Sequence, residues 1–254
     1  MKGFTAFAEK EILEQWRSYK MLILFAALCL FGMTSPLLAK LTPELLKNLS
    51  GPGVSMTLPK ATETEAWRQF FKNVGQMGIV VLLLIYGTNM PQEISRGTII
   101  IPLSKGLSRI AVLLAKFLTA LFVWTVGYVL AVLICCGYTQ YLFGRFTVPH
   151  LFFALLCLWL FGAFLLALTL FAGISMPGNY GGLLLTAAII GVLLTLDAFP
   201  KLQPWNPIAL AAQSTSLLTK PETAANLHNA VRSAMLGTLI CLSAGGYLFN
   251  KRNL

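Results

Sequence analysis

The chain has 254 residues, of which 57% are hydrophobic and only 11% are charged. Soluble domains carry about 25% charged residues, so a soluble fold of this length has no place to bury so much apolar surface. The formal net charge is +10, but lysines and arginines are scattered over loops and span ends, where anionic lipid headgroups attract them. We therefore predict an all-α integral membrane protein that is surrounded by the lipid bilayer and binds no nucleic acid.

Residues 4–19 are predicted to form an amphipathic helix. Apolar and charged side chains recur there at spacings of three and four, and so fall on opposite sides of a helix. The charged side holds Glu9, Lys10, Glu14 and Arg17, and the apolar stripe holds Phe4, Phe7, Ala8, Ile12, Trp16 and Tyr19. A soluble amphipathic helix would give the same pattern. The apolar run that follows directly favours an interfacial helix in the membrane plane.

Six apolar segments are predicted to cross the bilayer. The hydrocarbon core is about 30 Å thick, so each helical span needs about 20 mostly apolar residues. The predicted spans are about 21–39, 74–89, 110–138, 150–176, 183–199 and 234–249. Because the spans and their loops use up the chain, we predict a single transmembrane domain over residues 1–254.

Local signals mark several helix ends. Thr62 begins a capping box that opens the helix of the second span, and Pro91 is predicted to end that helix. Thr42 followed by Pro43 indicates the start of a short helix after the first span. Residues 200–221 are broken by prolines and contain no helix long enough to cross, so we predict an extracellular or re-entrant segment there.

Six spans place both termini on one side of the membrane. Short cytosolic loops are richer in Lys and Arg than external ones. The basic residues are only slightly denser on the side of the termini, so charge alone gives a weak preference for cytosolic termini.

The sequence contains no recognisable motif for nucleotide or metal chemistry. It has no G-x-x-x-x-G-K-[ST] phosphate loop and no H-E-x-x-H zinc motif. His150 and His228 stand alone, without the spacing of metal ligands. Asp197 is the one acid inside an apolar run, and it lies near the end of that run, where water reaches it. No catalytic residue, metal or cofactor is expected on this chain.

The polar stretch 91–109, between the second and third predicted spans, is the most informative segment. Its distinctive residues, together with one in the next helix, are Glu93, Arg96, Gly97, Thr98, Pro102, Leu103, Ser104, Ser108, Arg109 and Lys116. Residues 249–254 form a basic tail. Loop and tail resemble the permease subunits of type-2 ATP-binding-cassette exporters, which place an acid, Gly-Thr, a Leu-Ser element, Ser-Arg and then Lys at this point. One departure is Lys105-Gly106-Leu107, where the family more often has a Pro before Ser-Arg.

The resemblance implies roles for the residues of this stretch. It would be cytosolic and form a coupling helix that docks on a separate ATP-binding-cassette ATPase, which would bind ATP and Mg. Glu93 would pair with a base on the ATPase, or with Arg96 or Arg109. Gly97 would permit a tight turn, and Arg109 and Lys116 would anchor the third span at the lipid headgroups.

The resemblance also implies a larger assembly. The chain would be one permease half that pairs with a second copy or a relative, as homodimer or heterodimer, in the plasma membrane, most readily a bacterial inner membrane. Both termini would be cytosolic. The translocation path would lie between the two bundles, and the apolar, neutral spans favour an amphipathic substrate such as a drug, an antibiotic or a peptide.

Two other classes of protein remain open at this point. A stand-alone ion or solute carrier would need charged groups or broken helices near the middle of the membrane. A membrane-embedded lipid-modifying enzyme would need clustered His, Asp or Glu at one interface. The sequence reveals neither pattern.

Overall fold

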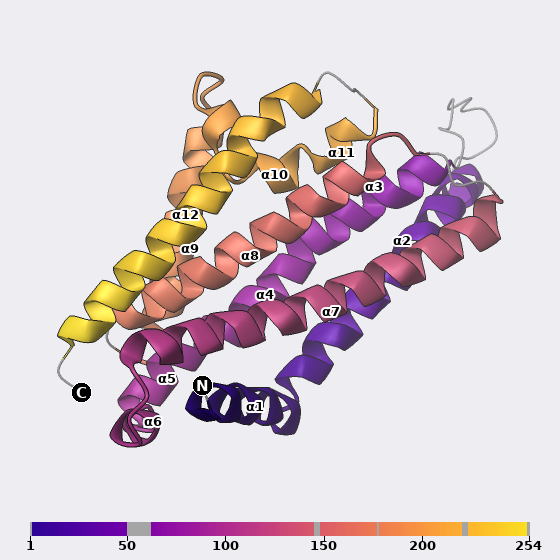
Figure 1. Ribbon diagram of the computed structural model, residues 1–254. Helices are drawn as coiled ribbons and strands as arrows, with labels where there is room; N and C mark the ends of the chain where they lie inside the picture. The colour runs from indigo at the N-terminus through magenta and orange to yellow at the C-terminus, as the bar shows by residue number, and fades with distance from the viewer. Residues whose placement is uncertain (1, 50–61, 145–147, 177, 220–222, 253–254) are drawn as a thin grey trace.

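The computed structural model describes residues 2–49, 62–144, 148–176, 178–219 and 223–252. These residues form helices and turns, and no strand occurs among them. Long helices run alongside one another in one bundle, and short helices lie at its two ends (Figure 1). The predicted all-α class is therefore confirmed.

The bundle contains five continuous helices and one segmented helix. The continuous helices are α2 (Lys20–Leu49), α7 (Arg109–Phe143), α8 (Leu151–Ser175), α9 (Gly181–Asp197) and α12 (Thr223–Lys251). The segmented helix consists of α3 (Glu63–Asn73), a π-helical turn η1 (Val74–Gly78), α4 (Ile79–Tyr86) and α5 (Asn89–Ser95). The short helices are α1 (Lys2–Arg17), α6 (Ile100–Ser104), η2 (Gln203–Trp205), α10 (Ala209–Ala212) and α11 (Ser214–Leu217).

Five helical segments of the described chain are long and apolar enough to cross a membrane. They are Lys20–Thr42, Glu63–Ser95, Arg109–Phe143, Leu151–Ser175 and Leu227–Lys251. The predicted span 183–199 corresponds to α9, which is apolar but has 17 residues. At 1.5 Å per residue such a helix is roughly 26 Å long, so its crossing of the membrane stays a prediction.

The helix end predicted at Thr62 is confirmed, whereas the one predicted at Pro91 is wrong. The Thr62 hydroxyl caps α3 by accepting a hydrogen bond from the Glu65 amide at 3.4 Å. The second span breaks at Gly87 and Thr88 and then continues as α5. Pro91 lies in the first turn of α5, where an amide N–H would have had no helical partner.

Thr42 does not begin a new helix, because α2 continues without a break to Leu49. The Thr42 hydroxyl donates to the Leu38 carbonyl at 2.5 Å, one turn back within the same helix. A proline removes one backbone hydrogen bond from a helix, and the helical hydrogen bonds can continue on either side of it. The helix of the first predicted span therefore extends to Leu49, and residues 50–61 lie outside the described part.

A sharp turn at Tyr19 sets the direction of α1. Tyr19 has φ of 58°, a left-handed conformation that costs a non-glycine residue about 1–2 kcal/mol. As a result α1 crosses the end of the bundle against α7 instead of extending α2 (Figure 1). Its outer side exposes more than half of Leu13, Trp16 and Tyr19.

The segment from residue 200 to 219 folds over the opposite end of the bundle from α1, α5 and α6 (Figure 1). Its apolar side chains Ile208, Leu210 and Leu217 are buried. Asn206 fixes it to α9 by donating to the Leu193 carbonyl at 2.7 Å. Residues 220 and 221 of the predicted proline-broken segment lie outside the described residues.

The core of the bundle is centred on α8, most of whose side chains are buried. Aromatic residues of α3 and α7 belong to the same core, including the fully buried Trp67 and Trp124. The Trp124 indole donates to the Trp159 carbonyl at 3.2 Å, and the Trp159 indole donates to the Thr125 hydroxyl at 3.0 Å. Buried indole groups need such partners, so this core is a specific packing arrangement.

Candidate functional site

The loop over residues 91–109 contains most of α5 and all of α6, and a glycine turn follows each of these short helices. Gly97 follows α5 with φ of 68°, and Gly106 follows α6 with φ of 87°. Only glycine adopts these angles without a steric penalty. The departure from the family pattern at Lys105-Gly106-Leu107 therefore places a glycine where the backbone needs one.

Hydroxyl groups of the predicted motif hold the turns of loop 91–109. Thr98 donates through both its amide and its hydroxyl to the Glu93 carbonyl, at 3.1 and 3.3 Å. Ser108 caps α7 by accepting a hydrogen bond from the Ala111 amide at 3.2 Å. These local bonds give the loop a defined shape.

Glu93 and Lys116 meet in a buried ion cluster with Glu11 of α1. Lys116 Nζ lies 2.5 Å from Glu93 Oε1 and 2.9 Å from both carboxylate oxygens of Glu11. The side chains of Lys116 and Glu11 are 5% and 7% exposed, and that of Glu93 is 16% exposed. Loss of one partner from such a cluster leaves a buried charge uncompensated. The cluster therefore ties α1, α5 and α7 together.

This geometry corrects two expectations about charged residues. Within the chain, Glu93 pairs with Lys116 and not with Arg96 or Arg109. Lys116 is buried in the ion cluster and does not reach the lipid headgroups. The physical reason is that α1 covers the start of α7, so the Lys116 ammonium lies between helices.

The inward face of α1 also differs from the predicted stripe. The buried residues are Phe7, Glu11 and Gln15, at intervals of four, whereas Trp16 is 62% exposed. Gln15 accepts a hydrogen bond from the Tyr86 hydroxyl at 2.8 Å. Polar side chains thus dock α1 onto the bundle, and part of its apolar stripe faces outward.

Lys10 and Glu14 form an ion pair beside the ion cluster, with 2.6 Å between Nζ and Oε2. Partial burial lowers the pKa of Lys10, but the hydrogen bond to Glu14 and the nearby acids outweigh this, so its pKa is raised. Partial burial raises the pKa of Glu14, but the hydrogen bond and charge of Lys10 outweigh this, so its pKa is lowered. Both groups are therefore charged at neutral pH.

A second contact holds loop 91–109 against the turn between α8 and α9. A side-chain carbon on Gly173 would lie 2.9 Å from Pro91 Cδ, and one on Gly182 would lie 2.7 Å from the Gly173 Cα. Close approach of this kind needs residues without a side chain. The Ser95 hydroxyl and the Asn179 side-chain oxygen are also 2.8 Å apart.

Arg109 joins the end of loop 91–109 to the C-terminal tail. Its Nη1 donates to the carbonyl oxygens of Phe249, Asn250 and Arg252, at 2.5, 3.2 and 2.6 Å. A cation at the last carbonyls of a helix also balances the helix dipole of α12. Arg252 in turn donates to the Ile174 carbonyl at the end of α8. The loop motif and the tail motif thus form one structural unit, although residues 253 and 254 of the tail lie outside the described part.

The remaining predicted residues lie around the tip of loop 91–109. Pro102 and Leu103 are half-buried, whereas Arg96, Thr98, Ser104 and Ser108 are exposed. The tip also presents two large apolar side chains, Ile100 and Ile101, which are 46% and 57% exposed. The tip is therefore partly apolar and partly basic.

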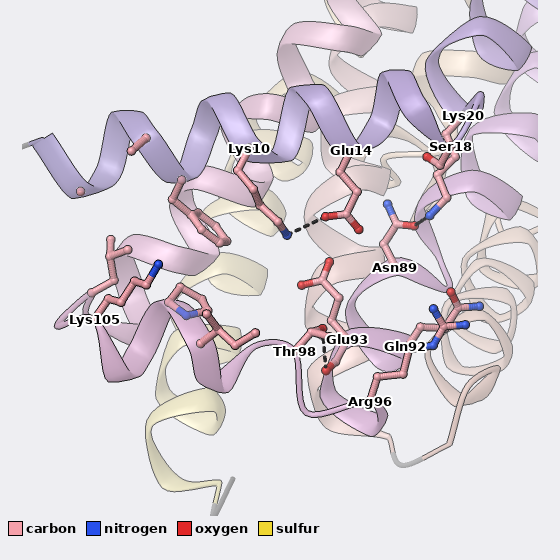
Figure 2. A pocket seen from close by; sticks show the side chains of 16 residues that line it. Lys10, Glu14, Ser18, Lys20, Asn89, Gln92, Glu93, Arg96, Thr98 and Lys105 are labelled. Carbon is pink, nitrogen blue, oxygen red and sulfur yellow. Dashed lines mark hydrogen bonds and ion pairs between the residues drawn. The ribbon is translucent and has the colours of Figure 1, made fainter.

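A cavity of about 720 Å³ separates α1 from loop 91–109 (Figure 2). Residues of both elements line it, among them Lys10, Glu14, Lys20, Glu93 and Arg96. Lys20 contacts the side-chain oxygen of Asn89 across one end of it. No group of three or more His, Cys, Asp or Glu side chains in the described residues is arranged to hold a metal ion.

Four residues of this site were not predicted from the sequence, namely Glu11, Gln15, Tyr86 and Asn179. Glu11 and Gln15 are one and two turns from Phe7, so their helical spacing was a usable signal. The contacts of Tyr86 and Asn179 connect distant segments, and no local pattern in the sequence marks them.

These features define a multi-pass helical membrane protein in which a folded polar loop is tied to several helices at one end of the bundle. Residues 5–254 match the family described as ABC-2 family transporter protein, and the chain belongs to that family. It is thus a membrane-embedded transport subunit, and its family implies an ATP-binding-cassette ATPase as partner. The chain is also 24% identical over 233 residues, 88% of both chains, to "Uncharacterized transmembrane protein YxlG" of Bacillus subtilis (strain 168).

Proposed function

We propose that this chain is the permease half of an ATP-driven exporter, and that loop 91–109 transmits movement from a separate ATPase subunit to the membrane helices. The observation that carries the proposal is the ion cluster of Lys116 with Glu93 and Glu11. A loop that moved alone could not shift the bundle. Because Lys116 joins the loop to α1 and α7, displacement of the loop displaces both helices.

The predicted residues divide into two groups in this proposal. Glu93, Gly97, Thr98, Ser108, Arg109 and Lys116 hold the loop in shape and join it to its neighbours. The tip, with Arg96, Pro102, Leu103 and Ser104 beside the exposed Ile100 and Ile101, meets the ATPase. An apolar centre with basic residues at its rim is a suitable surface for a protein partner.

The topology follows from the position of the ATPase in the cytosol. Loop 91–109 and both termini would then be cytosolic, with α1 at the membrane surface, α9 as a sixth span and residues 200–219 at the external end. The bilayer would be the plasma membrane of a bacterium. A second copy or a relative would complete the translocation path, and ATP and Mg would bind to the ATPase subunits.

The substrate we propose is amphipathic, such as a drug, an antibiotic or a peptide. The membrane-length helices of the bundle are apolar, with mean hydropathy from 1.3 to 2.7. The ion cluster lies at the α1 end of the bundle, beside the loop. A stand-alone carrier would instead place its charges near the membrane midplane.

The test is assembly with an ATP-binding-cassette ATPase encoded beside this chain. Ile101→Asp places a charge in the docking tip at a side chain that is 57% exposed, and we expect it to lower co-purification and ATPase stimulation at least tenfold. Leu202→Asp is the matched control, because Leu202 is 47% exposed at the other end of the bundle. Unchanged assembly of the Ile101→Asp variant would contradict docking at the tip.

A further inference from the structure

The cavity between α1 and loop 91–109 has a surplus of positive charge. Four cations line it, Lys10, Lys20, Arg96 and Lys105, with two acids, Glu14 and Glu93. Both acids are already paired, since Glu14 binds Lys10 and Glu93 binds Lys116. No ion pair involving Lys20, Arg96 or Lys105 occurs among the described residues.

Lys20 is the most informative of these three cations. It is half-buried at the first residue of α2, and its ammonium donates to the neutral Asn89 side-chain oxygen. A cation taken partly out of water with only a neutral partner gains from an anion in the cavity.

Hydrogen-bond donors gather at the Lys20 end of the cavity (Figure 2). Asn89, Gln92 and Arg96 share one face of α5 and its end, at intervals of three and four. Ser18 and Lys20 face them from the link between α1 and α2. A guanidinium fork with an ammonium and neutral donors is the set of groups that binds phosphate oxygens.

Apolar side chains also line the cavity, among them Ala6, Phe7, Pro102 and Leu107. A free inorganic ion would use only the donor end. An amphiphile with a phosphate head would use both.

The position of the cavity selects a lipid as the source of the phosphate. Its donor end lies where α2 begins, at the end of a membrane-length segment. Beside it, Trp16 and Tyr19 expose their rings, as aromatic residues do at the level of lipid headgroups. Anionic headgroups are concentrated next to such a site.

We propose that this cavity binds the headgroup of an anionic phospholipid, with the phosphate held by Lys20 and Arg96. The bound lipid would fix α1 against loop 91–109 from the membrane side. The inference needs α1 at the membrane surface, but it does not depend on the ATPase.

The test measures lipids retained by the purified full-length chain, by native mass spectrometry in detergent, with phosphatidylglycerol and phosphatidylcholine as probes. We expect selective retention of phosphatidylglycerol, and an affinity at least tenfold lower in the Lys20→Gln, Arg96→Gln variant. The matched control is Lys40→Gln, Arg68→Gln, which removes the same charges from exposed positions outside the cavity and should bind like the wild type. Lys20→Arg with Arg96→Lys should keep most of the affinity.

Three results would overturn the lipid inference. The first is equal retention of both lipids, or equal binding by the Gln variant and its control. The second is competition by glycerol 3-phosphate as strong as that by the lipid, which would assign the site to soluble phosphates. The third is complete displacement of the lipid by the assembled ATPase, which would assign the cavity to a protein partner and leave the proposed function standing.

Discussion

Lys116 lies 2.5 Å from Glu93 although the two residues are 23 positions apart and belong to different helices. The same ammonium contacts both oxygens of Glu11 at 2.9 Å. One buried cation therefore holds two carboxylates from two further helices, so the cluster sets the position of loop 91–109 relative to α1 and α7.

Replacement of this cation should destabilise the chain strongly. Lys116→Met keeps most of the length of the side chain but leaves Glu11 and Glu93 buried without a partner, which costs about 3–5 kcal/mol in comparable cases. We expect a loss of that size in unfolding measurements in detergent. Lys105→Met, at an exposed position of the loop, should change stability by about 0.5 kcal/mol or less.

A triple variant separates the charge effect from a packing effect. Lys116→Met combined with Glu11→Gln and Glu93→Gln removes both stranded charges and should recover a large part of the lost stability. Wild-type stability of the single Lys116→Met variant would mean that the ion cluster does not hold the three helices together.

The close approach of α8 and α9 at Gly173 and Gly182, beside Pro91, should be sensitive to a single methyl group. Gly182→Ala would place a carbon 2.7 Å from the Gly173 Cα, a backbone atom that cannot move aside cheaply. We expect destabilisation of about 1–3 kcal/mol. Gly191→Ala in the same helix meets nothing within 4 Å and should be neutral or stabilising by up to about 1 kcal/mol. Equal thermal stability of the two variants would refute a close contact here.

The hydrogen bonds from Arg109 to the end of α12 should protect the C-terminal tail from proteolysis. Three carbonyl oxygens of α12 and the tail accept hydrogen bonds from one guanidinium nitrogen, which lies one bond farther from the backbone than a lysine ammonium would. Arg109→Lys should therefore make trypsin cleavage after Lys251 and Arg252 several-fold faster. Arg68→Lys, which changes an exposed arginine on α3, is the control. Identical cleavage rates in the two variants would contradict a protective role of the Arg109 hydrogen bonds.

Much of the fold was predictable because local signals decide it. Runs of apolar residues predict the membrane-length segments, and the Thr62 cap predicts where α3 begins. The helix end predicted at Pro91 was wrong because a proline in the first turn of a helix and a proline that ends a helix look alike in sequence.

The site was predictable only in part. The motif in loop 91–109 identified the right segment, but the partner of Glu93 depends on how α1 folds back over α7. That path is set by the left-handed turn at Tyr19, a conformation the side chain does not favour and the sequence does not reveal. Glu11 shares a helix face with Phe7, but its partner Lys116 lies 105 positions away, so no local pattern identifies the pair.

The most direct test of the account is the side of the membrane on which loop 91–109 lies. A variant without the five native cysteines would carry Ile101→Cys in the exposed tip or, as its counterpart at the other end of the bundle, Leu202→Cys. A membrane-impermeant maleimide applied to intact cells should label residue 202 and leave residue 101 unlabelled, with the pattern reversed in inside-out vesicles. Labelling of residue 101 in intact cells would place the loop outside, where no ATPase could reach it.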